Sequence, residues 1–314
     1  MFREASPEER KRYYEEEWKE KDIPDFISTT LSRREFGFDY DGSGPSDRYN
    51  QFHSVIELKR ILKEKYPYAV FSSVAFYDNP KKRSGWMGAE LVFDIDAKDL
   101  PIKKCSCKSG EVCEICLEEA KEVVLLISDA LKDHFGFKKV RYIYSGRGYH
   151  IRILDEEIML LGRSERGKIL DYISCSILPK RFDIDFGYPK LFRDRLLFLL
   201  KYAKEDNFKI KGIGKVKIRR IMKEKRKIAN EIEDGEFSTL RKILGGKKFE
   251  NFLQFTTRIN AETVDAKVTV DVKRILRLPS SLHSKVSMKC IEIKNLEKFD
   301  PLRDAVPKFL KEEN

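Results

Sequence analysis

The sequence predicts an α+β fold, and three features support that class. Segments rich in β-branched and aromatic residues, which favour strands, recur through the first half of the chain. Segments whose apolar residues follow the helical spacing lie between them. The run SGRG at residues 145–148 separates two apolar segments and predicts the turn of a β-hairpin. We therefore expect a mixed β-sheet combined with helices, and a helical insert near residues 195–250.

The composition argues against a membrane-spanning protein and favours a polyanionic partner. Apolar residues make up 41% of the 314 residues, and no stretch reaches the roughly 20 apolar residues that a spanning helix needs. The N-terminus is charged from residue 3 and does not resemble a signal peptide, so we expect a cytoplasmic protein. Because 63 Lys and Arg residues stand against 52 Asp and Glu residues, nucleic acid is the favoured partner.

The elements of the first half follow in order from these patterns. Ser6 is placed as the N-cap of a first helix, with Pro7 and Glu9 in its first turn. Residues 1–30 are therefore expected to form a charged helix with an extended tail. The expected strands cover residues 33–38, 68–77, 91–96, 140–144 and 150–154, the helices residues 54–65 and 117–134, a loop residues 41–49, and a basic turn residues 79–87.

The character of the chain changes at about residue 195. Residues 195–250 are Lys-rich and helical in pattern, and residues 209–227 hold ten Lys or Arg residues against one acid. Such a run forms either a solvated helical face or a surface that contacts nucleic acid or another subunit. Apolar and β-branched residues then predict strands at residues 252–259, 264–272 and 274–278. The expected division is a main domain of residues 1–194 and 251–314 with an insert of residues 195–250.

Two carboxylates close the most informative strand. The alternation of a strand in the run LVFDID puts Asp94 and Asp96 on one face and Phe93 and Ile95 on the other. Neighbouring carboxylates repel each other, so the pKa of one rises unless a cation lies between them. Mg²⁺ and Mn²⁺ prefer oxygen ligands and keep positions open for substrate phosphates. The pair is therefore either a divalent-metal site or a strand end with two solvated Asp residues.

The predicted hairpin turn carries the second signal, the run SGRGYH at residues 145–150. Its glycines let the backbone approach a ligand closely. The Ser145 hydroxyl, the Arg147 guanidinium and the His150 ring are donors that suit phosphate oxygens. The alternative is an ordinary turn whose Arg side chain lies in solvent.

A third signal is the run DAKVTVDVKRILRLPSSLH at residues 265–283. A carboxylate from this run would complete a site for two metal ions about 3.5–4 Å apart. Asp265 and Asp271 are the two candidates, although an Asp in a loop is often a cap or a turn residue. Arg277 and His283 are suited to gripping a triphosphate.

Four of the six cysteines fall within residues 105–116, at Cys105, Cys107, Cys113 and Cys116. In a chain with no secretory signal, thiolate ligation of a metal is favoured over disulfides. Four thiolates about 2.3 Å from a Zn²⁺ ion form a closed structural site. Cys113 and Cys116 have the spacing of a zinc knuckle. Cys105 and Cys107 are closer than usual, so either of them could be a non-ligand.

Together these motifs resemble the small catalytic subunit of archaeal and eukaryotic DNA primase. The matching runs are FDIDAKD at residues 93–99, SGRGYH at 145–150 and the block at 265–283, and RREFGF at 33–38 and the cysteine cluster agree. Eukaryotic members carry two adjacent Arg residues in the turn, so the single Arg147 is similar to the archaeal form. The resemblance implies a primase-polymerase fold and a nucleotidyltransferase that synthesises short primers de novo for replication.

The resemblance also implies roles for individual residues. Asp94 and Asp96 would bind the catalytic metals, with Asp265 as the third carboxylate and Asp271 as the alternative. The contacts to the triphosphate would come from Ser145, Arg147, His150, Arg277 and His283. The implied cofactors are two Mg²⁺ or Mn²⁺ ions and a structural Zn²⁺ ion. The implied partners are nucleoside triphosphates, a single-stranded DNA template and a large primase subunit that forms a heterodimer with this chain.

Two other functions fit part of the sequence. A related repair-type primase-polymerase would share the carboxylates, and de novo initiation on single-stranded DNA would distinguish a primase from it. A non-enzymatic basic module that binds nucleic acid needs no carboxylate cluster, so metal-dependent dinucleotide synthesis would exclude it.

Overall fold

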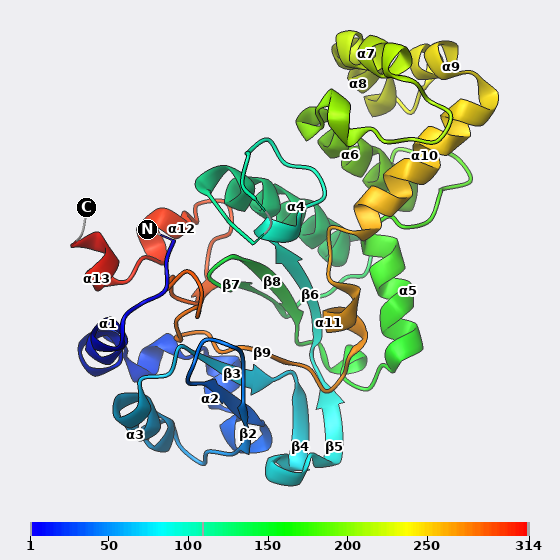
Figure 1. Ribbon diagram of the computed structural model, residues 1–314. Helices are drawn as coiled ribbons and strands as arrows, with labels where there is room; N and C mark the ends of the chain where they lie inside the picture. Colours follow the sequence, from blue (N-terminus) through cyan, green and yellow to red (C-terminus); the bar gives the residue numbers. More distant parts are fainter. Residues whose placement is uncertain (1, 109, 313–314) are drawn as a thin grey trace.

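The computed structural model describes residues 2–108 and 110–312 and combines a body of antiparallel sheets with an all-helical lobe (Figure 1). The α+β class is confirmed. The strands are β1 (Phe36–Asp39), β2 (Asp47–Asn50), β3 (Ala69–Ser73), β4 (Ala75–Asn79), β5 (Ser84–Ala89), β6 (Leu91–Asp96), β7 (Val140–Tyr144), β8 (Gly148–Ile153), β9 (Ile275–Arg277) and β10 (Ile291–Ile293). The helices are α1 (Pro7–Arg12), α2 (Asp25–Ser28), α3 (Val55–Lys65), α4 (Glu114–Asp133), α5 (Arg163–Ile173), α6 (Gly187–Tyr202), α7 (Lys215–Lys223), α8 (Lys225–Glu233), α9 (Ser238–Leu244), α10 (Gly246–Ala261), α11 (Ala266–Val270), α12 (Pro301–Asp304) and α13 (Lys308–Lys311).

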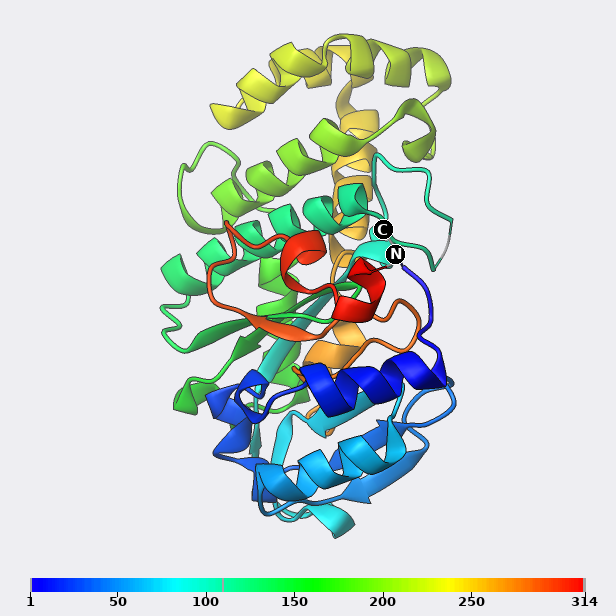
Figure 2. The same ribbon diagram turned by 90° about the vertical axis from the view of Figure 1, so that its left-hand side faces the viewer.

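The strands form three sheets, with the orders β10-β7-β8-β6, β2-β1-β3-β9 and β4-β5. Every pairing between these strands, in the part of the chain that the structure describes, is antiparallel rather than the expected mixture. β9 and β10 come late in the sequence but pair with β3 and β7, so the C-terminal segment completes both four-stranded sheets. The two termini lie on the same side of the body (Figure 2).

The main core lies between the sheet that contains β6 and helix α4. Strand alternation buries Phe93 and Ile95 completely, and they belong to the same apolar cluster as Val124 and Ile127 of α4. α11 packs against β6 and α5, so the acidic end of β6 lies close to the start of α11. This packing fixes the position of the candidate site.

Helices α6–α10 form a lobe with an apolar cluster of their own, which includes Leu196, Ile228 and Phe252. The helical character expected near residues 195–250 is confirmed, although α6 begins at Gly187 and α10 runs to Ala261. The division of the chain into domains remains a prediction.

Two of the expected late strands are wrong. Residues 252–259 lie in α10, because Phe252, Phe255 and Ile259 recur at intervals of three and four and form one apolar helical face. Residues 264–272 contain α11, whose N-cap Asp265 accepts a hydrogen bond from the backbone of Lys267. The strand expected at 274–278 is confirmed as β9.

The elements expected in the first half are largely confirmed, with four differences. The extended tail expected after the first helix contains a second helix, α2 (Asp25–Ser28). The segment 68–77 is two strands, β3 and β4, which part at Val74 and pair in different sheets. β5 occupies much of the expected basic turn. The sequence did not predict this strand, because four of its six residues are exposed and its composition is typical of a turn. β2 occupies the end of the expected loop. The first helix begins with the expected capping box of Ser6 and Glu9.

A buried ionic cluster joins distant segments beneath β6. Glu90, fully buried before the strand, accepts from Arg34 at 2.6 Å and from Arg152 at 3.1 Å, and both guanidiniums are fully buried. Arg166 of α5 donates to the backbone carbonyls of Glu90 and Ala89 at 2.7 Å. The geometry at the start of β6 therefore depends on buried charged groups, and removing one partner would leave an uncompensated buried charge.

Candidate active site

The acidic pair lies where β6 leaves the sheet. Asp94 and Asp96 face one way as predicted, and their side chains are 21% and 27% exposed. Pairing with β8 places Asp94 opposite His150 and Asp96 opposite Gly148. The hairpin turn is thereby aligned with the carboxylates.

Asp265 joins this pair through the backbone. Its N–H donates to the carbonyl oxygen of Asp94 at 3.0 Å, which docks the start of α11 onto β6. The charge of the Asp265 carboxylate also contributes to the raised pKa of Asp94. Asp265 and Asp271 are both exposed, but Asp271, the alternative, lines a neighbouring groove with Arg48 and Arg83. Of the two candidates, the structure brings Asp265 to the acidic pair.

The carboxylates are destabilised as anions. Burial, followed by the charges of Asp96 and Asp265, raises the pKa of Asp94 to about 7. Burial also raises the pKa of Asp96, opposed by the positive charges of Arg147 and Lys98. Such a cluster, with two half-buried carboxylates and the exposed Asp265 beside them, is suited to binding divalent cations, which would remove the repulsion.

The glycines of the SGRG turn are required by close packing. A Cβ on Gly148 would lie 2.4 Å from the carbonyl oxygen of Ile95, so only glycine lets β8 begin this close to β6. Gly146 has φ +100°, and a Cβ there would lie 2.4 Å from Cβ of His283. The turn and the C-terminal motif, far apart in the sequence, are thus in direct contact.

Basic side chains line the side of the site formed by the turn and the segment after β9. Arg147 lies with Nη2 3.5 Å from a carboxylate oxygen of Asp96, and its Nε is buried without a hydrogen-bond partner. Nη1 of Arg277 is buried and unpaired as well. Burial and the charge of Arg147 lower the pKa of Arg277, opposed by Cys290. Unpaired buried donors of this kind indicate a site for an anion.

Two histidines complete the basic side. Burial and the nearby arginines hold the pKa of both His150 and His283 well below the usual value, so both rings are neutral at neutral pH. Nδ1 of His283 accepts the N–H of Lys285 at 3.1 Å, which leaves its proton on Nε2 as a donor. Nε2 of His150 lies 3.6 Å from Asp94. Ser145, at the start of the turn, is half-buried.

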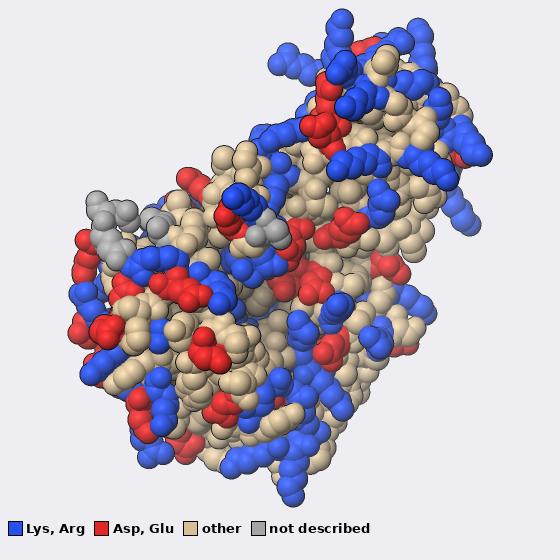
Figure 3. Space-filling view, viewed as in Figure 1, with Lys and Arg blue, Asp and Glu red and all other residues tan. Residues whose placement is uncertain are grey.

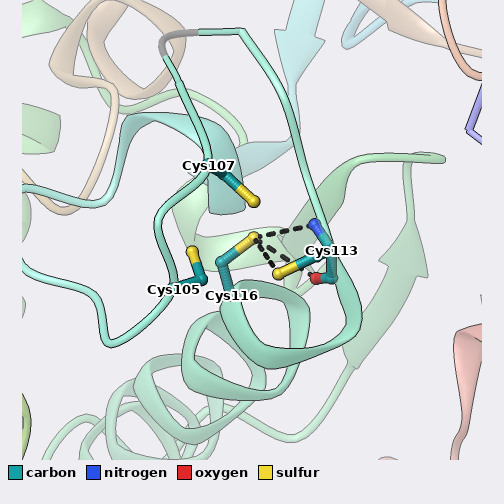
Figure 4. A group of neighbouring side chains, drawn as sticks. All are labelled: Cys105, Cys107, Cys113 and Cys116. Carbon is teal, nitrogen blue, oxygen red and sulfur yellow. Dashed lines mark hydrogen bonds between the residues drawn. The ribbon is translucent and has the colours of Figure 1, made fainter.

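The four cysteines come together at the start of α4 (Figure 4). Their sulfur atoms all lie within 4.8 Å of one another, and theirs is the only group of three or more His, Cys, Asp or Glu ligand atoms this close among residues 2–108 and 110–312. Sγ of Cys113 and Sγ of Cys116 are 3.9 Å apart, close to the roughly 3.8 Å expected around a tetrahedral zinc ion. Both Cys105 and Cys107 belong to the group, so neither is excluded as a ligand.

Comparison with known proteins decides the family. The sequence model of the DNA primase small subunit matches residues 93–294, a range that contains every candidate residue described above. The chain belongs to the DNA primase small subunit family. The primase small subunits of Methanothermobacter thermautotrophicus and Methanobrevibacter smithii, both named PriS, are 46% and 44% identical to it, with 99% of this chain and 98% and 99% of the relatives covered. That of Pyrococcus furiosus is 43% identical, with 100% of this chain and 95% of the relative covered.

Two further cations of this primase small subunit act on the acidic cluster and were not singled out from the sequence. Nζ of Lys98 lies 3.4 Å from Asp96, and the positive charge of Arg274 lowers the pKa of Asp94 against the other effects. Lys98 lies inside the FDIDAKD run, so the motif itself could have signalled it. Arg274 likewise lies inside the run at residues 265–283, so that motif could have signalled it as well. In the described parts of the chain, no helix is long and apolar enough to cross a membrane.

Proposed function

We propose that this chain is the catalytic subunit of a DNA primase, which joins nucleoside triphosphates into short primers on single-stranded DNA for replication. The observation that carries the proposal is the juxtaposition of three carboxylates with buried, partly unpaired basic side chains. The carboxylates suit divalent cations and the basic groups suit a triphosphate. Membership of the primase small subunit family supplies the reaction class.

Asp94, Asp96 and Asp265 would hold two Mg²⁺ or Mn²⁺ ions. The fit is supported by the docking of α11 on β6, where the N–H of Asp265 donates to the carbonyl oxygen of Asp94 at 3.0 Å. Burial and the charges of Asp96 and Asp265 raise the pKa of Asp94, which agrees with this arrangement. When bound, the ions would activate the attacking 3′-hydroxyl and neutralise the pyrophosphate leaving group.

The basic residues would bind and orient the incoming nucleotide. Arg147 and Arg277 supply positive charge for the β- and γ-phosphates, and Nε2 of His283 and the hydroxyl of Ser145 supply neutral donors. Because these groups are held by the fold, they stabilise the charge of the transition state with little reorganisation. A neutral His150 beside Asp94 positions the carboxylate without competing with a cation for it.

The cysteine group would hold a structural Zn²⁺ ion. Four sulfur ligands leave no open position for chemistry, so we assign the site to stability of the loop before α4.

A partner is needed for the first bond. That bond joins two separate nucleotides, so a second nucleotide must be held beside the first. The relatives are named as small subunits, and we propose that this chain forms a heterodimer in the cytoplasm with a large primase subunit that supplies this help.

Unprimed synthesis on single-stranded DNA tests the proposal. We expect Asp94→Asn combined with Asp96→Asn to abolish incorporation of labelled nucleotides with manganese, because the cation ligands are lost. Asp133→Asn, which removes an exposed carboxylate at the end of α4, is the matched control and should remain active. Incorporation by the double variant at the control rate would refute the proposal.

The same assay separates the remaining alternatives. Loss of synthesis in Asp271→Asn but not in Asp265→Asn would move the third carboxylate to Asp271. Extension of a supplied primer without any unprimed product would favour a repair-type primase-polymerase.

A further inference from the structure

A basic groove of about 540 Å³ lies beside the acidic cluster. Its charged lining consists of Arg48, Arg83, Lys273 and Arg274, with Asp271 as the one acid among its lining residues. Lys273 and Arg274 form no ion pair with any residue of the described ranges 2–108 and 110–312. The lining of the groove therefore carries more positive than negative charge.

A buried carboxylate holds two of these cations in place. Glu35, whose side chain is fully buried, accepts from Arg48 at 2.6 Å and from Arg83 at 2.5 Å. One negative charge shared by two guanidiniums leaves a net positive pair. The shared carboxylate also fixes the pair in position. Each guanidinium uses only part of its donors on Glu35, so the remaining donors can bind a ligand.

The floor of the groove is shaped by a missing side chain. A Cβ on Gly37 of β1 would lie 3.0 Å from Cδ of Arg48 and 3.3 Å from Cδ1 of Ile275. Glycine at this position lets the stem of Arg48 lie across the strand. The arginine is thus placed by β1 as well as by Glu35.

An exposed tyrosine stands between the same two arginines. The ring of Tyr49 has guanidinium carbons of Arg48 and Arg83 at 5.6 and 5.3 Å from its centroid, and the residue is 51% exposed. Its backbone has φ +67°, which is unfavourable for a bulky residue. An aromatic ring presented to solvent beside fixed cations is a platform on which a nucleic acid base can stack.

The groove leads toward the candidate active site. Arg274 lines the groove and its charge also acts on the carboxylate of Asp94. β9 then carries the chain on to Arg277, in the basic side of the site. Figure 3 shows Lys and Arg side chains gathered over the β4–β5 hairpin, below the acidic group near the middle of this face. A strand lying along the groove would therefore reach the carboxylates.

We propose that this groove binds the single-stranded DNA template, with its phosphates on Arg48, Arg83, Lys273 and Arg274 and a base stacked on Tyr49. The inference rests on the proposed primase function and assigns its template a place. The shared phosphate chemistry would also suit the triphosphate of a second free nucleotide, which is an outcome of the test.

Binding of a fluorescein-labelled single-stranded DNA oligonucleotide, followed by anisotropy with no nucleotide present, tests the proposal. Tyr49→Asn removes the ring but tolerates the left-handed backbone, and should weaken binding about fivefold to 30-fold, whereas Tyr49→Phe keeps the ring and should bind normally. Lys273→Ala should weaken binding and reduce the slope of log affinity against log salt by about one. Lys294→Ala, which removes a 75% exposed lysine on the far side of the β10 edge, is the matched control.

Neither test variant changes Glu35, Arg48 or Arg83, so the ion pairs that hold the groove are kept. Unchanged DNA affinity in both Tyr49→Asn and Lys273→Ala would overturn the proposal. So would weakened binding of a free nucleoside triphosphate, measured separately, with DNA affinity intact. Asp94→Asn with Asp96→Asn should bind DNA normally, so failure of the groove and failure of the catalytic assignment are distinguishable.

Discussion

Burial and the charges of two neighbouring carboxylates both disfavour the ionised form of Asp94. It belongs to a strand buried on its other face, and it lies near two further carboxylates. Without a cation, the folded chain must hold this charge where burial and repulsion both oppose it. Functional sites often keep such local destabilisation because their chemistry needs it.

The metal-free protein should therefore gain stability from Asp94→Asn. The raised pKa means that folding favours the protonated carboxyl, so the wild-type chain loses stability as pH rises from the unfolded value near 3.8 through about 7. We expect the variant to be more stable by roughly 1–2 kcal/mol above pH 7, with the difference fading as the pH falls toward 4. Thermal unfolding in a chelator across this pH range measures it.

Asp133→Asn provides the comparison, because it removes a carboxylate from an exposed helix end. A stability difference for Asp94→Asn that is the same at every pH would show that Asp94 is not destabilised as an anion.

At the scale of elements, the β7–β8 hairpin contacts both the acidic and the basic side of the candidate active site. Its register with β6 aligns His150 with Asp94, and its turn packs against His283. Two glycines make both contacts possible, one through φ +100° and one through a close backbone approach. A small change in the turn should therefore act on nucleotide binding.

Gly146→Ala should raise the KM for nucleotide by roughly tenfold or more, because its Cβ displaces His283 and the turn that carries Arg147. Gly44→Ala is the control, since Gly44 has φ +125° but nothing within 4 Å of its Cβ position. Both variants strain the backbone, and only the first meets a neighbour. Steady-state kinetics of nucleotide incorporation checks this, and equal effects of the two variants would contradict the proposed role of the contact.

We expect the order of the loop before α4 to depend on metal binding by the cysteine group. Cys113→Ser should release zinc and increase hydrogen exchange in residues 103–108 and 110–113, because one of the four thiolate ligands is lost. Cys175→Ser, which changes a buried cysteine outside the group, should keep its zinc. Metal analysis with hydrogen exchange tests this, and a purified wild-type chain without zinc would refute the zinc assignment.

On the scale of the whole molecule, features that depend on neighbouring residues were predicted better than contacts between distant segments. Strand alternation around Asp94 and Asp96, the hairpin at 145–148 and the first capping box depend on neighbouring residues, and the structure agrees with each. Strands predicted at 252–259 and 264–272 failed, because β-branched and aromatic residues there serve a helical face and a capped turn.

Which distant residues come together at the site could not be predicted from the residues alone. Asp265 and Asp271 have similar local sequences, and only the docking of α11 on β6 separates them. The contact of Gly146 with His283 and the sharing of Glu35 by Arg48 and Arg83 also join segments that no local pattern relates. The family resemblance supplied the site residues, whereas the structure supplied their arrangement.

The late position of β9 and β10 in the chain has a consequence for biosynthesis. A ribosome makes the β6–β8 strands, the cysteine group and the helical lobe before it reaches residues 265–293, which dock back onto both sheets. A nascent chain, or a product truncated before residue 283, would lack Asp265 or His283 however well its earlier parts had folded. Competence to make a primer would thus arise only after translation has passed residue 283 and this segment has docked.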